Sequence, residues 1–149
     1  MEGGFDLEPC LGSLSTYTRA GFGGYRGRIL MAGDILPIAR TEVEDRDELH
    51  LSPAPKYSPQ APIRVTWGLQ QDYFTDASLK RFVSESFTIH ADADRMGFRI
   101  FGPELEHRDD YNIVSDGIAT GAIQVPGNGH PIILLSDHQT TGGYPKIAT

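Results

Sequence analysis

The sequence predicts a mainly β protein, either a β-barrel or a β-sandwich, with a single short helix. Two observations support this fold class: short apolar stretches recur between turn-rich pieces, and only one segment has the apolar periodicity of a helix. The chain has 149 residues, of which 39% are apolar. A domain of this length buries about 70% of the surface of its unfolded chain, so one hydrophobic core can form.

Most of the expected strands lie in the second half of the chain. Ile63, Val65 and Trp67 alternate with polar residues, which is the period of a half-buried strand. The other expected strands contain Phe87 and Ile89, Phe98 and Ile100, Ile113, Ile123 and Val125, and Ile132–Leu135.

The expected helix follows Thr75, whose hydroxyl can cap its first turn. Leu79, Phe82 and Val83 would then share one apolar face, because they are spaced three and four residues apart.

The first 40 residues are rich in glycine and are interpreted as a fragment of a preceding β domain. Ile29-Leu30 and Ile35-Leu36 flank a Gly-Asp turn, which predicts a hairpin. The string GFGGYRG (21–27) lacks the GxGxxG spacing and a following helix, so we expect a turn instead of a phosphate-binding loop.

An acidic and proline-rich stretch separates two parts of the chain. Residues 41–48 hold five acids and one arginine, and four prolines follow within 53–62. Such a composition is typical of an extended connector. We therefore expect a connector at 41–62 and a β-barrel domain at 63–149.

Charge and composition exclude several classes of function. The net charge of −7 disfavours nucleic acid as a partner, and apolar runs such as Ile132–Leu135 are too short to span a membrane. The lone Cys10 cannot form an internal disulfide, and the acidic N-terminus is unlike a signal peptide, so the cytoplasm is the expected compartment.

Two polar groups carry weaker signals. His90, Asp92 and Asp94 would share one face of a strand, but no further His or Cys lies nearby, so we expect no metal site. Ser136, Asp137 and His138 are adjacent in sequence and no GxSxG elbow occurs, which disfavours an esterase.

The string HQTTGGYP (138–145) is the strongest candidate for a site. It follows the most apolar predicted strand and combines hydroxyl, amide and imidazole groups with two glycines, the material of an anion or oxyanion cradle. An ordinary Gly-Gly turn explains the same residues equally well.

Three long strings together give a family resemblance: residues 11–38, 91–103 (with DRMGFR) and 115–148 (with GAIQVP and QTTGGYP). The chain resembles the biotin-dependent carboxyltransferase family, also called allophanate hydrolase subunit 2. The resemblance implies a cyclophilin-like β-barrel, here C-terminally incomplete, and an isolated chain that is inactive. One departure is Leu69, which stands where the family usually has proline, while Gln70, Asp72 and Phe74 of the same motif remain.

The resemblance also implies site residues. Asp94 and Arg95 are expected to be catalytic, with Arg95 and the glycine corner near Gly143 converging on one small anionic or carbonyl-bearing molecule. The implied substrate-binding residues are Gln124, His138, Gln139, Thr140, Thr141, Gly142, Gly143, Tyr144 and Lys146.

The implied function is that of the C subunit of bacterial ATP-dependent 5-oxoprolinase. This subunit would act on a lactam together with a B-subunit-like partner (allophanate hydrolase subunit 1) and with the A subunit. ATP would be used by the complex, and biotin, where it is used, would come from a partner, because no Met-Lys-Met sequence occurs here. The alternatives are carboxyl transfer from carboxybiotin to urea, and a non-catalytic module that binds a kinase inhibitor.

Overall fold

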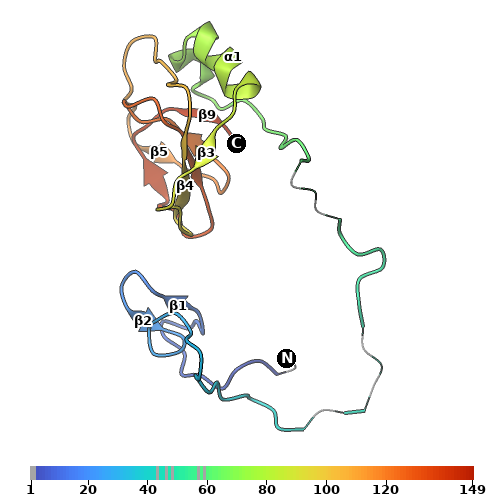
Figure 1. Cartoon of the computed structure of the whole chain (residues 1–149). Helices are drawn as coiled ribbons and strands as arrows, with labels where there is room; N and C mark the ends of the chain where they lie inside the picture. Colours follow the sequence, from blue (N-terminus) through green and yellow to red (C-terminus); the bar gives the residue numbers. More distant parts are fainter. Residues whose placement is uncertain (1–2, 43, 46, 48, 57, 59) are drawn as a thin grey trace. The chain divides into compact units, whose positions relative to one another are not determined.

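The computed structural model describes residues 3–42, 44, 45, 47, 49–56, 58 and 60–149. The chain divides into two compact units, Met1–Lys56 and Tyr57–Thr149. The division falls inside the acidic and proline-rich stretch. Figure 1 shows the first unit in blue to cyan and the second in green to red.

The first unit is built on a small hairpin and several turns. Strands β1 (Thr16–Tyr17) and β2 (Phe22–Gly23) pair antiparallel, with Tyr17 opposite Phe22. The hairpin expected around Gly33 is wrong, because the segment that contains it forms no strands. The reason is Asp34, whose carboxylate accepts hydrogen bonds from Arg28 Nη1 and from Met31 N, both at 2.7 Å, and thereby closes a local turn.

The described residues of the second unit form two antiparallel sheets, whose strands are drawn as arrows in Figure 1. The larger has the strand order β3-β4-β7-β6-β9, and the smaller pairs β5 with β8. Their bounds are β3 Thr88–Ile89, β4 Gly97–Phe101, β5 Asp116–Gly117, β6 Ile123–Gln124, β7 Ile132–Leu134, β8 Thr141–Gly142 and β9 Lys146–Ala148.

The one α-helix among the described residues, α1 (Asp76–Ser84), precedes the larger sheet in the sequence and follows a 3-10 turn at Gln71–Tyr73. The hydroxyl of Thr75 accepts a hydrogen bond from Ser78 N at 3.2 Å, which confirms the predicted cap. A mainly β fold with one helix is therefore confirmed. The cyclophilin-like barrel stays a prediction, because among the described residues no pairing joins β3 to β9 and closes the sheet. Nor do the described residues include a helix long and apolar enough to cross a membrane.

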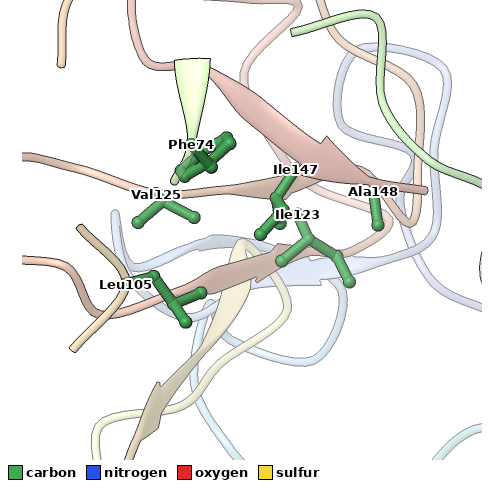
Figure 2. Close-up of a cluster of buried hydrophobic side chains, with 6 residues drawn as sticks. All are labelled: Phe74, Leu105, Ile123, Val125, Ile147 and Ala148. Atoms are coloured by element: carbon green, nitrogen blue, oxygen red, sulfur yellow. The ribbon is translucent and has the colours of Figure 1, made fainter. Parts of the chain in front are cut away.

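The hydrophobic core of the second unit lies on strands β6 and β9 and on the segments beside them (Figure 2). Its buried members are Phe74, Leu105, Ile123, Val125, Ile147 and Ala148. Gln124 and Lys146 are neighbours of these residues in the sequence and are also buried. The core thus fixes the backbone that carries the buried polar side chains of Gln124 and Lys146.

The expected strand at 63–67 is only partly realised. Thr66 and Thr149 exchange two backbone hydrogen bonds of 2.8 Å, and Trp67 bridges Ala148. Ile63, however, is 87% exposed and Val65 is 39% exposed, so the predicted half-burial of this strand is wrong for Ile63. Ile113 also lies outside any strand, although its N–H donates to Gly143 O at 2.9 Å.

Candidate functional site

The two sheets of the second unit bring a lysine and an aspartate together. Lys146, the first residue of β9, places its Nζ 2.8 Å from Asp116 Oδ2 on β5. The lysine side chain is only 9% exposed, whereas that of Asp116 is 48% exposed. The hydrogen bond from Lys146 and then that from Gly117 N hold the pKa of Asp116 below its ordinary value. The Asp116 carboxylate is therefore charged at neutral pH and is open to solvent beside the buried lysine side chain.

Gln70 completes this pair from a distant part of the chain. Its Oε1 accepts a hydrogen bond from Lys146 N at 3.4 Å, and its Nε2 donates to Asp116 Oδ2 at 3.4 Å. Neither Gln70 nor Asp116 was among the predicted site residues. Asp116 lies in one of the three strings that carry the family resemblance and Gln70 in the motif around Leu69, but nothing in the sequence shows that residues 46 positions apart make contact.

Two amide side chains lie beside the charged pair. Gln124 is opposite Lys146 in the β6–β9 register, and its Nε2 donates to Tyr144 O at 3.3 Å. Gln139 Nε2 donates to Gln124 Oε1 at 3.4 Å. A Cβ on Gly142 would lie 2.6 Å from Gln124 Nε2, so a larger residue at this position would displace the Gln124 amide. We call Gln70, Asp116, Gln124, Gln139 and Lys146 the Lys146 cluster.

The remaining predicted binding residues shape the loop around the cluster. His138 Nε2 lies 3.2 Å from Thr120 Oγ1, and its Nδ1 contacts Gln139 O. Thr140 O accepts a hydrogen bond from Ile118 N, and Thr141 lies opposite Gly117 in the β5–β8 pair. In the described contacts these residues therefore position the backbone of the loop.

Arg95 occupies a separate, exposed corner. Its Nε and Nη2 donate to the two oxygens of Asp137 at 2.9 and 3.1 Å, and Asp137 N donates to Arg95 O at 3.0 Å. This hydrogen bonding raises the pKa of Arg95 and lowers that of Asp137. The carboxylate of Asp94 accepts from Met96 N at 2.8 Å and so closes a turn. The arginine side chain is 75% exposed.

The structure brings some of the predicted residues together and leaves others apart. Gln124, Gln139, Gly142, Tyr144 and Lys146 meet at the Lys146 cluster. In the part of the chain that the structure describes, no contact joins the Arg95 guanidinium to residues 139–146. The convergence of Arg95 and Gly143 on one molecule therefore stays a prediction.

No group of three His, Cys, Asp or Glu side chains is placed to hold a metal ion among the described residues. His90 and Asp92 form a pair at 3.2 Å, and His90, Asp92 and Asp94 are all exposed, but residues 90–96 lie outside any strand, so the three side chains do not share a strand face.

An open hollow of about 430 Å³ lies in the first unit, against the GFGGYRG string. Its lining residues are Glu8, Pro9, Cys10, Gly21, Phe22, Gly23, Gly24, Arg26 and Gly27. Arg26 has a left-handed backbone with φ 57°. Sequence reasoning predicted only a turn here, and no predicted site residue lines the hollow.

Comparison with known proteins gives relatives of two named kinds. The chain is 38% identical over 148 residues to the C subunit of 5-oxoprolinase from Escherichia coli K12 and 40% identical to that from Haemophilus influenzae, covering 99% of this chain and 47% of each relative. It thus spans about half the length of these curated relatives. Urea amidolyase of Kluyveromyces lactis has a similar structure, with a TM-score of 0.72 and 29% identity over 99% of this chain and 10% of that one.

The family comparison covers the whole sequence. Residues 1–149 match the family described as carboxyltransferase domain, subdomain A and B. This agrees with the resemblance carried by the three strings, and with the relatives named above. The chain therefore belongs to the carboxyltransferase domain family, subdomains A and B.

Proposed function

We propose that this chain provides part of the substrate site of an ATP-dependent 5-oxoprolinase, in the role of the C subunit. This enzyme hydrolyses the lactam C–N bond of 5-oxoproline to give glutamate, coupled to hydrolysis of ATP. Identities of 38% and 40% to two 5-oxoprolinase proteins, against 31% to urea amidolyase of Lachancea kluyveri, favour this branch.

The single observation that carries the proposal is the buried ammonium of Lys146 beside the half-exposed carboxylate of Asp116. An ammonium has three N–H donors, and Asp116 takes one of them at 2.8 Å. A donor of this kind binds a substrate carboxylate or polarises a carbonyl more strongly where water is largely excluded.

The neighbouring amides fit a lactam. Gln124 and Gln139 each present a carbonyl oxygen and an NH₂ group, and the lactam ring offers the complementary N–H and C=O. Both side chains are already hydrogen-bonded to each other, which fixes their orientation before substrate binds.

Arg95 and Asp94 belong to the same proposal as a second contact point. Arg95 is exposed and is held in a fork geometry by Asp137, so a substrate carboxylate can replace Asp137 as its partner. Asp94 would orient this corner through its hydrogen bond from Met96 N.

Neither ATP nor biotin is assigned a step on this chain. None of the three lysines, Lys56, Lys80 and Lys146, lies in a Met-Lys-Met sequence, and Lys146 is also buried and ion-paired, which does not suit attachment of biotin. We propose that ATP acts in the whole complex and that biotin would come from a partner. The proposed partners are a B-subunit-like protein, of the allophanate hydrolase subunit 1 kind, and the A subunit.

Reconstitution tests this function. The chain is combined with the A and B subunits and with the part of the C subunit that it does not cover, and ATP-dependent glutamate release from 5-oxoproline is measured. Lys146→Met should raise KM about 10- to 100-fold, since a hydrogen bond to a charged group contributes about 1.5–3 kcal/mol. Lys80→Met on the exposed face of α1 is the matched control.

Two results would contradict the proposal: an assembled complex without oxoprolinase activity, or a Lys146→Met complex with wild-type kinetics. The isolated chain is expected to be inactive in the same assay.

Carboxyl transfer to urea is the second candidate, and the TM-score of 0.72 to urea amidolyase favours it. To test this candidate, the reconstituted chain is combined with a biotin carboxylase and a biotinylated carrier. Carboxylation of urea without glutamate release from 5-oxoproline would support it. The non-catalytic binding role stays a prediction from the resemblance.

A further inference from the structure

We propose that Thr120 and His138 form a second reactive centre, in which the imidazole activates the threonine hydroxyl as a nucleophile toward small carboxylic esters. The acyl group of the ester would pass through Thr120 Oγ1. The substrate site proposed above at the Lys146 cluster uses neither side chain, so this inference does not depend on which reaction the family member performs.

The contacts of the imidazole fix which of its nitrogens carries the proton. His138 Nδ1 contacts Gln139 O, and because a carbonyl oxygen only accepts hydrogen bonds, Nδ1 is the donor. In the neutral imidazole the other nitrogen, Nε2, then has a free lone pair. This Nε2 lies 3.2 Å from Thr120 Oγ1, so the threonine hydroxyl donates its hydrogen bond to a nitrogen that can accept the proton.

The backbone holds both side chains at one end of strand β7. Gly121 N, directly after Thr120, donates to Leu134 O at 2.7 Å, and Leu134 is the last residue of β7. His138 N donates to Leu135 O at 3.1 Å. The nucleophile and its base are therefore fixed to consecutive residues of the chain. Such placement matters because a displacement of about 1 Å can cost about 100-fold in rate.

The arrangement has the parts of an activated nucleophile: a hydroxyl, a base within about 2.6–3.2 Å and a third group that orients the base. Thr120 is exposed, so an ester can reach its hydroxyl. Among the described residues none accepts a hydrogen bond from Thr120 N, which leaves this N–H to bind the oxygen of an attacked carbonyl. In the described contacts His138 pairs with Thr120 and not with Ser136, its neighbour in the sequence.

The chemical step is an acyl transfer. Thr120 Oγ1 forms a bond to the carbonyl carbon of the ester, and its proton passes to His138 Nε2. The bond from the carbonyl carbon to the leaving oxygen then breaks, and the leaving alcohol takes the proton from the imidazolium. Water hydrolyses the acyl-threonine ester by the same route, which releases the carboxylic acid and restores the hydroxyl.

Acetylation of the full chain by p-nitrophenyl acetate tests the proposal. Release of p-nitrophenolate is followed by absorbance, and the acetylated residues are identified by peptide mass spectrometry. We expect Thr120 to be acetylated at least about tenfold faster than Thr140 and Thr141, because a positioned general base contributes about 10²- to 10⁴-fold. These two threonines are also exposed and serve as internal controls. Unfolding in concentrated urea should remove the preference.

Variants assign the roles of the two side chains. Thr120→Val removes the hydroxyl and should abolish acetylation at this position, whereas Thr120→Ser keeps a hydroxyl and should retain it. His138→Gln removes the base and should slow acetylation of residue 120 at least about tenfold. His90→Gln is the matched control, since His90 is an exposed histidine that pairs with Asp92 and should leave the rate unchanged.

Three results would overturn the proposal. The first is acetylation of Thr120 no faster than that of Thr140 and Thr141 in the wild-type chain, which requires no variant to fold. The second is an equal preference for Thr120 in the folded and the urea-unfolded chain. The third is a rate at Thr120 that His138→Gln leaves unchanged, which would reduce the contact to an ordinary surface hydrogen bond.

Discussion

The two units of the chain are stabilised in different ways. Every hydrophobic side chain that the structure describes as buried belongs to the second unit, from Phe74 onward. In the described part of the first unit the only buried residue is Gly27, and apolar residues such as Ile29 and Ile35 are exposed. The second unit has a core in the ordinary sense, whereas the first depends on turns, on glycine conformations and on the Arg28–Asp34 pair.

This difference shows which part can support a site. A buried polar group needs a rigid surrounding, because its hydrogen bonds must compensate for lost hydration. Strands β6 and β9 provide that surrounding for Gln124 and Lys146. The first unit offers an open hollow whose shape depends on turns.

The largest effect is expected from Phe74→Ala in the core of the second unit. Phe74 is fully buried, so its truncation should lower the free energy of unfolding by about 3–5 kcal/mol. Urea unfolding followed by Trp67 fluorescence measures this change. Val83→Ala, at an exposed position of α1, should change the free energy by less than about 0.5 kcal/mol. Equal effects of the two changes would contradict the assignment of the core to the second unit.

A smaller effect is expected from Gly27→Ala in the first unit. Gly27 has φ 64°, and an added Cβ would lie 2.1 Å from Gly21 O, so both strain and a steric clash oppose the substitution. Gly12→Ala is the control, since Gly12 has φ 78° with open space around it. We expect Gly12→Ala to cost about 1 kcal/mol and Gly27→Ala about 1–3 kcal/mol more. Hydrogen exchange of residues 13–35 measures both, and identical exchange would show that packing around Gly27 is loose.

The smallest effects on stability are expected from changes of pH, and they occur in different pH ranges for the two units. Burial lowers the pKa of His107 from 6.5, so as the pH falls below about 6.5 the unfolded chain binds a proton first and the second unit loses stability. Arg28 lowers the pKa of Asp34 from 3.8 to about 2, so the first unit keeps this contribution above pH 3.8 and loses it as the pH falls toward 2.

Trp67 fluorescence reports the first transition and hydrogen exchange of residues 28–34 reports the second. His107→Phe should flatten the pH dependence of the second unit alone, and Asp34→Asn should remove that of the first unit alone. A shared pH window for both units would contradict the different origins of their stability.

Local features of the fold were predicted well from the sequence. The Thr75 cap and the helix after it, and the strands around Phe98, Ile123 and Ile132, depend on side-chain period and on capping within a few residues. The hairpin at Gly33 was predicted wrongly because the Asp34 carboxylate satisfies the backbone locally and competes with a ladder. Exposure of Ile63 was missed because period alone does not show whether a second layer covers a strand.

The sequence by itself determined the family and the loop of glycine, hydroxyl and amide residues at 138–145. Only the tertiary structure decided that Lys146 faces Asp116 and Gln70, and that Arg95 faces Asp137. The physical reason is that these contacts join residues 30 to 76 positions apart. Such contacts depend on strand register and on the packing of one sheet on another, which no local pattern of residues encodes.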